Sequence, residues 1–234
     1  MTDDDFATRV SRLSALAEPA RRALYRYVAA QPEPVSRDQA GEGVGVPRHT
    51  AKFHLDKLVD EGLLTTEFRR LTGRSGPGAG RPTKLYRPSK DEVAVSVPER
   101  HYDLAGQLMA AAIESATTGG TDVVAELHRA AAQHGGAVAE EATRRTGART
   151  GRGRRLAAVG ETLAEHGYQP RLDGDTLTLT SCPFHALAQD HTQLVCGMNL
   201  ALLGRVAETA GLTATLDPAP DRCCVVLSAD PARG

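Results

Sequence analysis

The sequence has no tryptophan, and aromatic residues of all kinds make up only 4% of its 234 residues. Aliphatic side chains must therefore fill the core, which favours a helix-rich architecture. No run approaches the roughly 20 apolar residues that a membrane-spanning helix requires. The first five residues, Met-Thr-Asp-Asp-Asp, are acidic where a secretory signal peptide is basic. These absences predict a cytoplasmic protein without a membrane association.

Cysteine is also scarce, with four residues that all lie at or after position 182. This number is too small for a disulfide-rich scaffold, and clustered thiols in a reducing compartment indicate metal binding or redox chemistry instead. With 41% hydrophobic and 24% charged residues, the composition is that of an ordinary globular protein with room for two modest domains.

The net charge of −1 hides an asymmetry along the chain. Residues 1–90 hold 16 Lys and Arg against 11 Asp and Glu, whereas residues 91–234 hold 12 against 18. The segment 69–90 contains seven basic residues and no acidic one, a charge pattern that suits a polyanion such as nucleic acid.

Three helices are predicted in this basic part, with a tight glycine turn between the second and the third. Ser36 and Gln39 form a capping box that opens the short second helix. When Ala51 and Leu55 of the third helix face the core, its polar side chains face outward and fit a major groove. The predicted helices span about 19–31, 37–41 and 47–62, and the outward or flanking residues are Arg48, His49, Thr50, Lys52, Phe53 and Lys57.

A predicted β-hairpin follows, with strands over 63–68 and 83–87 around the glycine-rich loop 73–80. Arg74 and Arg81 near its tip and Lys84 on its second strand are candidates for phosphate contacts. The string from Val46 to Leu58, followed by Glu-Gly-Leu-Leu, resembles the ArsR-type winged-helix repressors. This resemblance implies a winged helix-turn-helix that binds double-stranded DNA.

The middle of the chain, 91–150, is predicted to contain a linker or short edge strand and then two Ala-rich helices, over 102–119 and 123–145. Gly135 and Gly136 are expected to weaken the second of them. These helices are candidates for the interface of a homodimer on a palindromic operator, or for simple packing within the chain.

The remaining part, 151–234, alternates helix, hairpin, helix and hairpin, with an Asp190–Gln193 capping box opening the long second helix. The prediction is thus an α+β protein of three regions: a DNA-binding domain (1–90), a helical region (91–150) and a cysteine-containing domain with a small antiparallel sheet (151–234).

The four cysteines are predicted on three elements of this last region. Cys182 follows the first hairpin, Cys196 lies in the long helix, and Cys223 and Cys224 lie in the last strand, where their side chains alternate. Three thiols could share a zinc ion or an iron–sulfur cluster, with His185 or His191 as a further ligand, or they could be inert core residues.

The segments Ser-Cys-Pro-Phe-His at 181–185, Leu-Val-Cys-Gly-Met-Asn at 194–199 and Arg-Cys-Cys-Val at 222–225, after a winged helix, resemble the SufR-type regulators. The resemblance implies a repressor of iron–sulfur assembly genes, with a cluster, [4Fe–4S] in this interpretation, held by Cys182, Cys196 and one of Cys223 and Cys224, of which Cys224 is slightly favoured. Alternatives are a regulator that senses zinc, an organic ligand or thiol oxidation. A thiol enzyme is disfavoured, because no catalytic motif accompanies the cysteines.

Overall fold

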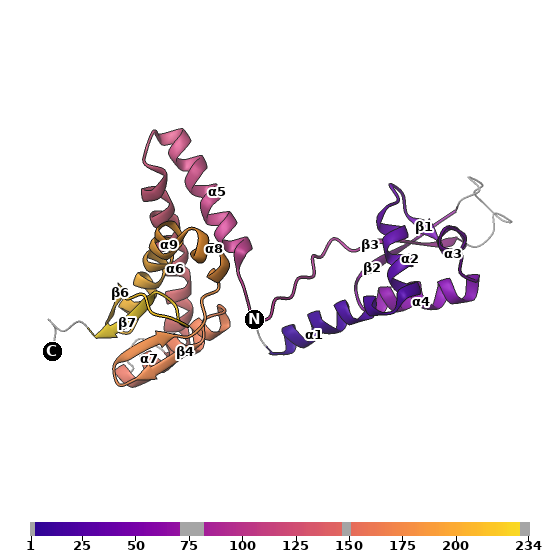
Figure 1. Ribbon diagram of the computed structural model, residues 1–234. Helices are drawn as coiled ribbons and strands as arrows, with labels where there is room; N and C mark the ends of the chain where they lie inside the picture. The colour runs from indigo at the N-terminus through magenta and orange to yellow at the C-terminus, as the bar shows by residue number, and fades with distance from the viewer. Residues whose placement is uncertain (1–2, 71–81, 147–150, 230–234) are drawn as a thin grey trace. The chain divides into compact units, whose positions relative to one another are not determined.

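A computed structural model describes residues 3–70, 82–146 and 151–229, and the chain divides into two compact units after Val95 (Figure 1). Each unit combines helices with a small antiparallel sheet, which confirms the predicted α+β class. Among the described helices, none is both long and apolar enough to cross a membrane.

The N-terminal unit is a helix-turn-helix followed by a hairpin, as predicted. In its three-stranded sheet β3 lies between β1 and β2, and Thr66 of β2 faces Tyr86 of β3. Its elements are α1 (Asp3–Ser14), a 3-10 turn (Ala15–Ala17), α2 (Pro19–Ala29), β1 (Val35–Ser36), α3 (Arg37–Val44), α4 (Arg48–Asp60), β2 (Leu64–Arg69) and β3 (Thr83–Pro88).

Local signals fixed most of the boundaries in this unit. The Ser36–Gln39 capping box is present, and Gly62 adopts the expected left-handed conformation after α4, with φ of 70°. Helix α3 runs three residues further than predicted, because the left-handed residue that ends it is Gly45 (φ 75°) and the glycine at position 43 stays helical.

Helix α1 was not predicted, because its apolar residues Val10 and Leu13 remain exposed and do not mark a core-facing side. It is held by Arg12, whose guanidinium donates to the backbone oxygens of Glu61 at 2.9 Å and Gly62 at 2.6 Å. These oxygens lie at the C-terminal end of α4, so a cation there also complements the helix dipole.

The C-terminal unit contains one four-stranded antiparallel sheet in the order β4-β5-β7-β6, and residues 91–100 before it contain no strand. Its elements are α5 (Tyr102–Gly119), α6 (Val123–Thr146), α7 (Arg152–Glu165), β4 (Pro170–Asp173), β5 (Thr176–Leu179), α8 (His185–Asp190), α9 (Thr192–Thr209), β6 (Leu212–Leu216) and β7 (Val225–Ala229).

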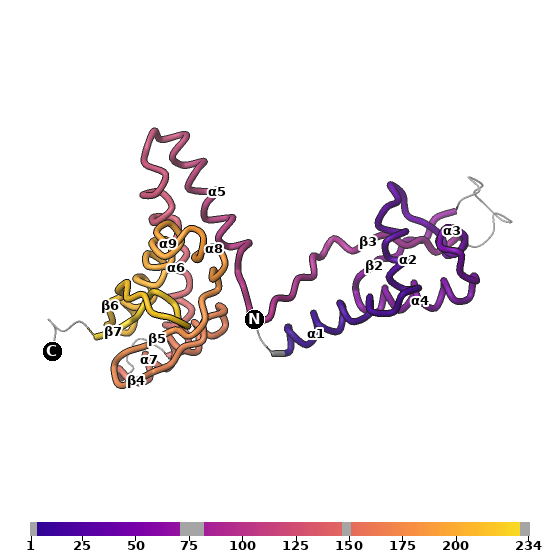
Figure 2. The backbone as a smooth tube through the Cα atoms, viewed as in Figure 1, coloured from indigo at the N-terminus to yellow at the C-terminus, as the bar shows by residue number. Residues whose placement is uncertain are grey.

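Helices α6 and α9 form the centre of this unit, and Figure 2 shows α5 running alongside α6 as a helical hairpin. At Gly135 the two central helices approach so closely that a Cβ atom would overlap the backbone of Leu202. Gly135, which we expected to weaken α6, is therefore the residue at which α6 packs closely against α9. Because α6 and α9 share one core, the regions 91–150 and 151–234 are not separate compact units.

The start of α9 differs from the prediction. Asp190 is the last residue of the short helix α8, and His191 precedes α9 without a side-chain cap, so the predicted Asp190–Gln193 capping box is wrong. A helix of six residues with no buried residue gives no periodic signal, which is why α8 was not expected.

Candidate cysteine site and nucleic-acid interface

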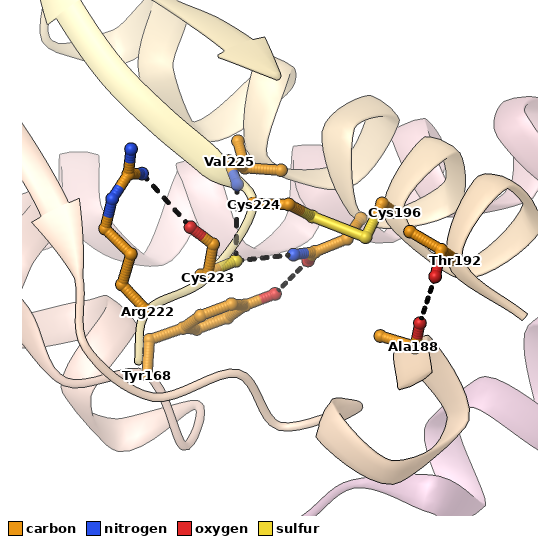
Figure 3. Close-up of a disulfide and its surroundings, with 9 residues drawn as sticks. Tyr168, Ala188, Thr192, Cys196, Arg222, Cys223, Cys224 and Val225 are labelled. Atoms are coloured by element: carbon orange, nitrogen blue, oxygen red, sulfur yellow. Dashed lines mark hydrogen bonds between the residues drawn. A yellow bond between two sulfur atoms is a disulfide. The ribbon is translucent and has the colours of Figure 1, made fainter. Parts of the chain in front are cut away.

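The structure brings the four cysteines together in the C-terminal unit. Cys196, in the second turn of α9, forms a disulfide with Cys224, just before β7, with a Cα–Cα distance of 6.6 Å (Figure 3). Cys182, after β5, and Cys223 are both buried and free, and each thiol shifts the pKa of the other. The thiols thus form two pairs that the adjacent residues Cys223 and Cys224 connect.

Polar groups surround the free pair. Asn199, which is 1% exposed, donates from Nδ2 to the Cys223 sulfur at 3.3 Å and accepts from the Tyr168 hydroxyl at 2.5 Å. The guanidinium of Arg100 donates to the backbone oxygen of Cys182 at 3.0 Å. These contacts fix the position of the free pair inside the core.

The two free thiols have unlike proton affinities. The hydrogen bond from Cys223 lowers the pKa of Cys182 against the opposing effect of burial, and the Phe184 amide and Arg100 lower it further. The same hydrogen bond raises the pKa of Cys223, and burial adds to this rise. Cys182 is therefore the thiolate-prone partner, and Cys223 keeps its proton and donates it.

The structure differs from the expectation that only one residue of the adjacent pair can face the other cysteines. Strand β7 begins at Val225, and Cys224 lies in a bend before it. The strict alternation of a strand does not apply there, so Cys224 reaches Cys196 while Cys223 reaches Cys182. His185 and His191 are exposed, and neither joins the cysteines.

Within the described residues, no group of three or more His, Cys, Asp or Glu side chains is arranged to hold a metal ion. In this structure the disulfide occupies two of the four sulfurs. The donor set nevertheless suits a thiolate-ligated group once that bond is reduced, since four soft sulfur ligands already lie in one region.

The second candidate site is the exposed face of α4 in the N-terminal unit. Ala51 and Leu55 are fully buried, as predicted, whereas Phe53 is 64% exposed. Arg48, His49 and Lys52 are exposed as well, while Thr50 and Lys57 are half-buried at the edge of this face. The predicted residues thus lie on one side of the helix.

A groove lies between this face and the hairpin. Its charged lining combines cations with one carboxylate, that of Asp38, and Phe68, which is 66% exposed, adds an aromatic ring. The principal lining residues are Arg37, Asp38, Arg48, Lys52, Phe68, Thr83, Lys84 and Tyr86. Arg74 and Arg81, which were predicted near the hairpin tip, lie outside the described residues.

Asp56 connects α4 to the hairpin across this groove. Its Oδ1 accepts from Lys84 at 2.7 Å and from the Tyr86 hydroxyl at 2.8 Å, and its Oδ2 lies 3.1 Å from the Lys52 ammonium. Partial burial opposes ionisation, but the three donors together lower the pKa of Asp56 to about 2. The carboxylate is therefore a fixed negative charge that orients two of the predicted DNA-binding cations.

The other predicted cations of α4 also have carboxylate partners. Arg48 Nε lies 2.7 Å from Asp38 of α3, and Lys57 lies 2.7 Å from Glu61. The position of Lys57 is thus tied to the end of α4 and not to the groove. The sequence pattern indicated these cations but not Asp38 as a partner of Arg48, because Asp38 belongs to a neighbouring helix.

A family model described as a helix-turn-helix domain matches residues 16–67. Residues 16–67 form a helix-turn-helix domain. The match extends from the 3-10 turn before α2 to within β2, so it includes α4 and the face described above. It supports an ArsR-like type of domain and a DNA-binding transcriptional regulator. Comparison with the curated proteins gave no match.

The helix-turn-helix domain and the cysteines occupy different units of the chain, since the family match ends well before the boundary at Val95. The exposed cations lie in one unit and the buried thiols in the other. This division separates a surface suited to a polyanion from an interior suited to redox or ligand chemistry.

Proposed function

We propose that this protein is a transcriptional repressor in which the state of the cysteine cluster controls the affinity for double-stranded DNA. The observation that carries the proposal is the gathering of all four cysteines in the core of a chain whose other unit holds a helix-turn-helix domain. The four cysteines come from three segments of the chain, and their meeting in one place suits metal binding or redox chemistry.

The ligand we propose is an iron–sulfur cluster of the [4Fe–4S] type, held by Cys182, Cys196 and Cys224. Cys223 is the structural thiol in this proposal, because Cys224, and not Cys223, lies against Cys196. An iron–sulfur cluster supplies a redox-active and chemically labile centre to such a site. The resemblance to SufR-type regulators suggests iron–sulfur assembly genes as the target.

We further propose a homodimer on a palindromic operator, consistent with the docking geometry of helix-turn-helix proteins. The α5–α6 hairpin is the proposed interface in the C-terminal unit. Four large hydrophobic residues of this hairpin are at least 40% exposed, which supports the choice: Tyr102, Ile113, Val123 and Val124.

A second candidate function is direct sensing of thiol oxidation, and the Cys196–Cys224 disulfide favours it. In this case an oxidant removes two electrons and two protons from the two thiols, and the bond itself changes the DNA affinity. No cluster is required, and Cys182 and Cys223 then serve to pack the core.

Anaerobic purification followed by visible absorption, iron and sulfide analysis separates these candidates. The cluster hypothesis predicts a brown protein with iron and sulfide, whose DNA affinity changes when the iron is removed under reducing conditions. Cys182→Ser, Cys196→Ser and Cys224→Ser each lose the iron, and Cys223→Ser, the matched control beside Cys224, retains it.

Other outcomes decide against the proposal in specific ways. If the purified protein contains zinc and no sulfide, the cysteines form a zinc site and not an iron–sulfur cluster. A colourless protein whose DNA affinity follows only the state of the Cys196–Cys224 bond establishes the thiol sensor. Iron loss in Cys223→Ser with retention in Cys224→Ser reverses the assignment of the third ligand.

A further inference from the structure

Arg48 has the placement of a residue that reads bases. It is the first residue of α4, and its side chain is 64% exposed at the groove. The N-terminal residues of a recognition helix are those that meet base edges in the major groove. Arg48 therefore stands where sequence can be read, and not only where charge can be neutralised.

The ion pair with Asp38 fixes how this side chain can bind. Asp38 Oδ1 forms an ion pair with the guanidinium, with Nε the nearest nitrogen at 2.7 Å, and among the described residues the terminal nitrogens Nη1 and Nη2 form no hydrogen bond. The contact lies at the Nε edge of the planar guanidinium, so the carboxylate restrains the side chain without covering its two terminal nitrogens. The two terminal nitrogens then form a fork that matches the N7 and O6 acceptors of guanine.

We propose that Arg48 recognises a guanine in the operator and that Asp38 is the residue that positions it. This inference rests on the proposed DNA-binding function and adds a base specificity to it. Asp38 itself belongs to the first turn of α3, so its carboxylate is anchored to the second helix of the motif. The side chain is consequently restrained before DNA arrives, which lowers the entropic cost of binding.

The neighbouring cations differ from Arg48 in this respect. Asp56 holds the ammonium groups of Lys52 and Lys84, which carry no fork and suit phosphate as point charges. The Asp38–Arg48 pair is thus better suited to the bases than to the backbone.

Selection of binding sites from a random double-stranded DNA pool tests this inference, with the full chain in both its iron-loaded and iron-free forms. Wild type should enrich a site with an invariant guanine in each half. Arg48→Ala should lose the preference at that position alone and bind the selected site about 10- to 100-fold more weakly. Arg48→Lys, which keeps the charge without the fork, should lose the same preference.

Replacing that guanine by 7-deazaguanine removes the N7 acceptor and should weaken wild type but leave Arg48→Ala unchanged. The positioning role is tested with Asp38→Ala against Glu42→Ala, which changes an exposed carboxylate one turn further along α3. Both variants gain one unit of positive charge, but only Asp38→Ala should relax the guanine preference. Circular dichroism and thermal unfolding verify that each variant is folded.

The inference is overturned if Arg48→Ala selects the same site as wild type, or if 7-deazaguanine weakens both proteins equally. If Asp38→Ala and Glu42→Ala change the guanine preference equally, Asp38 acts only through its charge, and its positioning role is overturned. A selected site without an Arg48-dependent guanine contradicts only this inference. Absence of any enriched site for wild type contradicts the proposed regulator as well.

Discussion

The two units of this protein place their reactive groups in opposite environments. In the N-terminal unit the groups of interest lie on the surface, where Arg48 and Phe53 are both 64% exposed. In the C-terminal unit they lie in the core, where Cys182 and Cys223 are 8% and 2% exposed. The first unit presents charge to a partner, and the second encloses soft sulfur ligands.

This difference determines what supports each site. The α4 face depends on its helix and on the carboxylates that orient its exposed cations. Surface ion pairs contribute little to the free energy of unfolding, so these pairs serve to orient the cations and not to stabilise the unit. The cysteine site depends on the packing of α6 against α9, since that contact positions the helix that carries Cys196 and Asn199. Substitutions that alter packing should therefore affect the second site far more than the first.

The largest expected effect concerns the disulfide of the C-terminal unit. The bond closes a loop between residues 28 positions apart, so its removal by Cys196→Ala or Cys224→Ala should lower the free energy of unfolding of the oxidised unit by about 3 kcal/mol. Urea unfolding with and without dithiothreitol measures this, and wild type should respond to the reductant while the variants do not. A reductant effect in both variants would contradict the assigned pairing.

A smaller effect is expected where α6 and α9 meet. Gly135→Ala places a Cβ against the backbone of Leu202 and should destabilise the C-terminal unit by about 1–3 kcal/mol. At the matched control Gly136, an added Cβ meets nothing within 4 Å, so Gly136→Ala should stabilise the helix by about 0.5–1 kcal/mol. Thermal unfolding gives both values, and thiol titration should show more accessible cysteines in Gly135→Ala only.

The smallest effect concerns Asp56 in the N-terminal unit. Asp56→Ala leaves the buried Tyr86 hydroxyl without this acceptor and should cost about 1–2 kcal/mol. Lys52→Ala, which removes an exposed member of the same network, should cost at most about 0.5–1 kcal/mol. Equal losses in the two variants would show that the hydroxyl contact adds nothing to the ion pairs.

The stabilisation by Asp56 also has a pH dependence with a defined sign. Its pKa in the folded protein is lowered to about 2, so its contribution is complete above the ordinary range for aspartate and is lost as the pH falls towards 2. The difference in unfolding free energy between wild type and Asp56→Ala should be constant from pH 5 to 7 and shrink below about pH 4. A constant difference down to pH 2 would contradict the lowered pKa.

Local sequence signals predicted most of the N-terminal unit. The capping box at Ser36, the left-handed Gly62 and the 3.6-residue spacing of Ala51 and Leu55 each act within a few residues. The same spacing placed Arg48 and Lys52 on the exposed face. It could not identify Asp38, because the packing of α3 against α4 brings that carboxylate to Arg48.

For the C-terminal unit the sequence indicated the elements but not how they meet. It placed each of the four cysteines near its element, and the resemblance grouped them, but neither gave the two pairs. The bend at Cys224 lies where the connection from β6 to β7 ends, and the residue types there did not predict it. The role of Gly135 was predicted wrongly for a related reason. Its effect on helix propensity is local, whereas its contact with Leu202 joins residues 67 positions apart.

The amino-acid sequence by itself thus determined the α+β class, the helix-turn-helix and its exposed basic face, because periodicity, caps and turns are encoded by near neighbours. The tertiary structure alone decided which thiols pair and which carboxylate orients each cation. Those contacts join residues far apart in the chain, and the free energy that selects them comes from the packing of helices and strands into a common core.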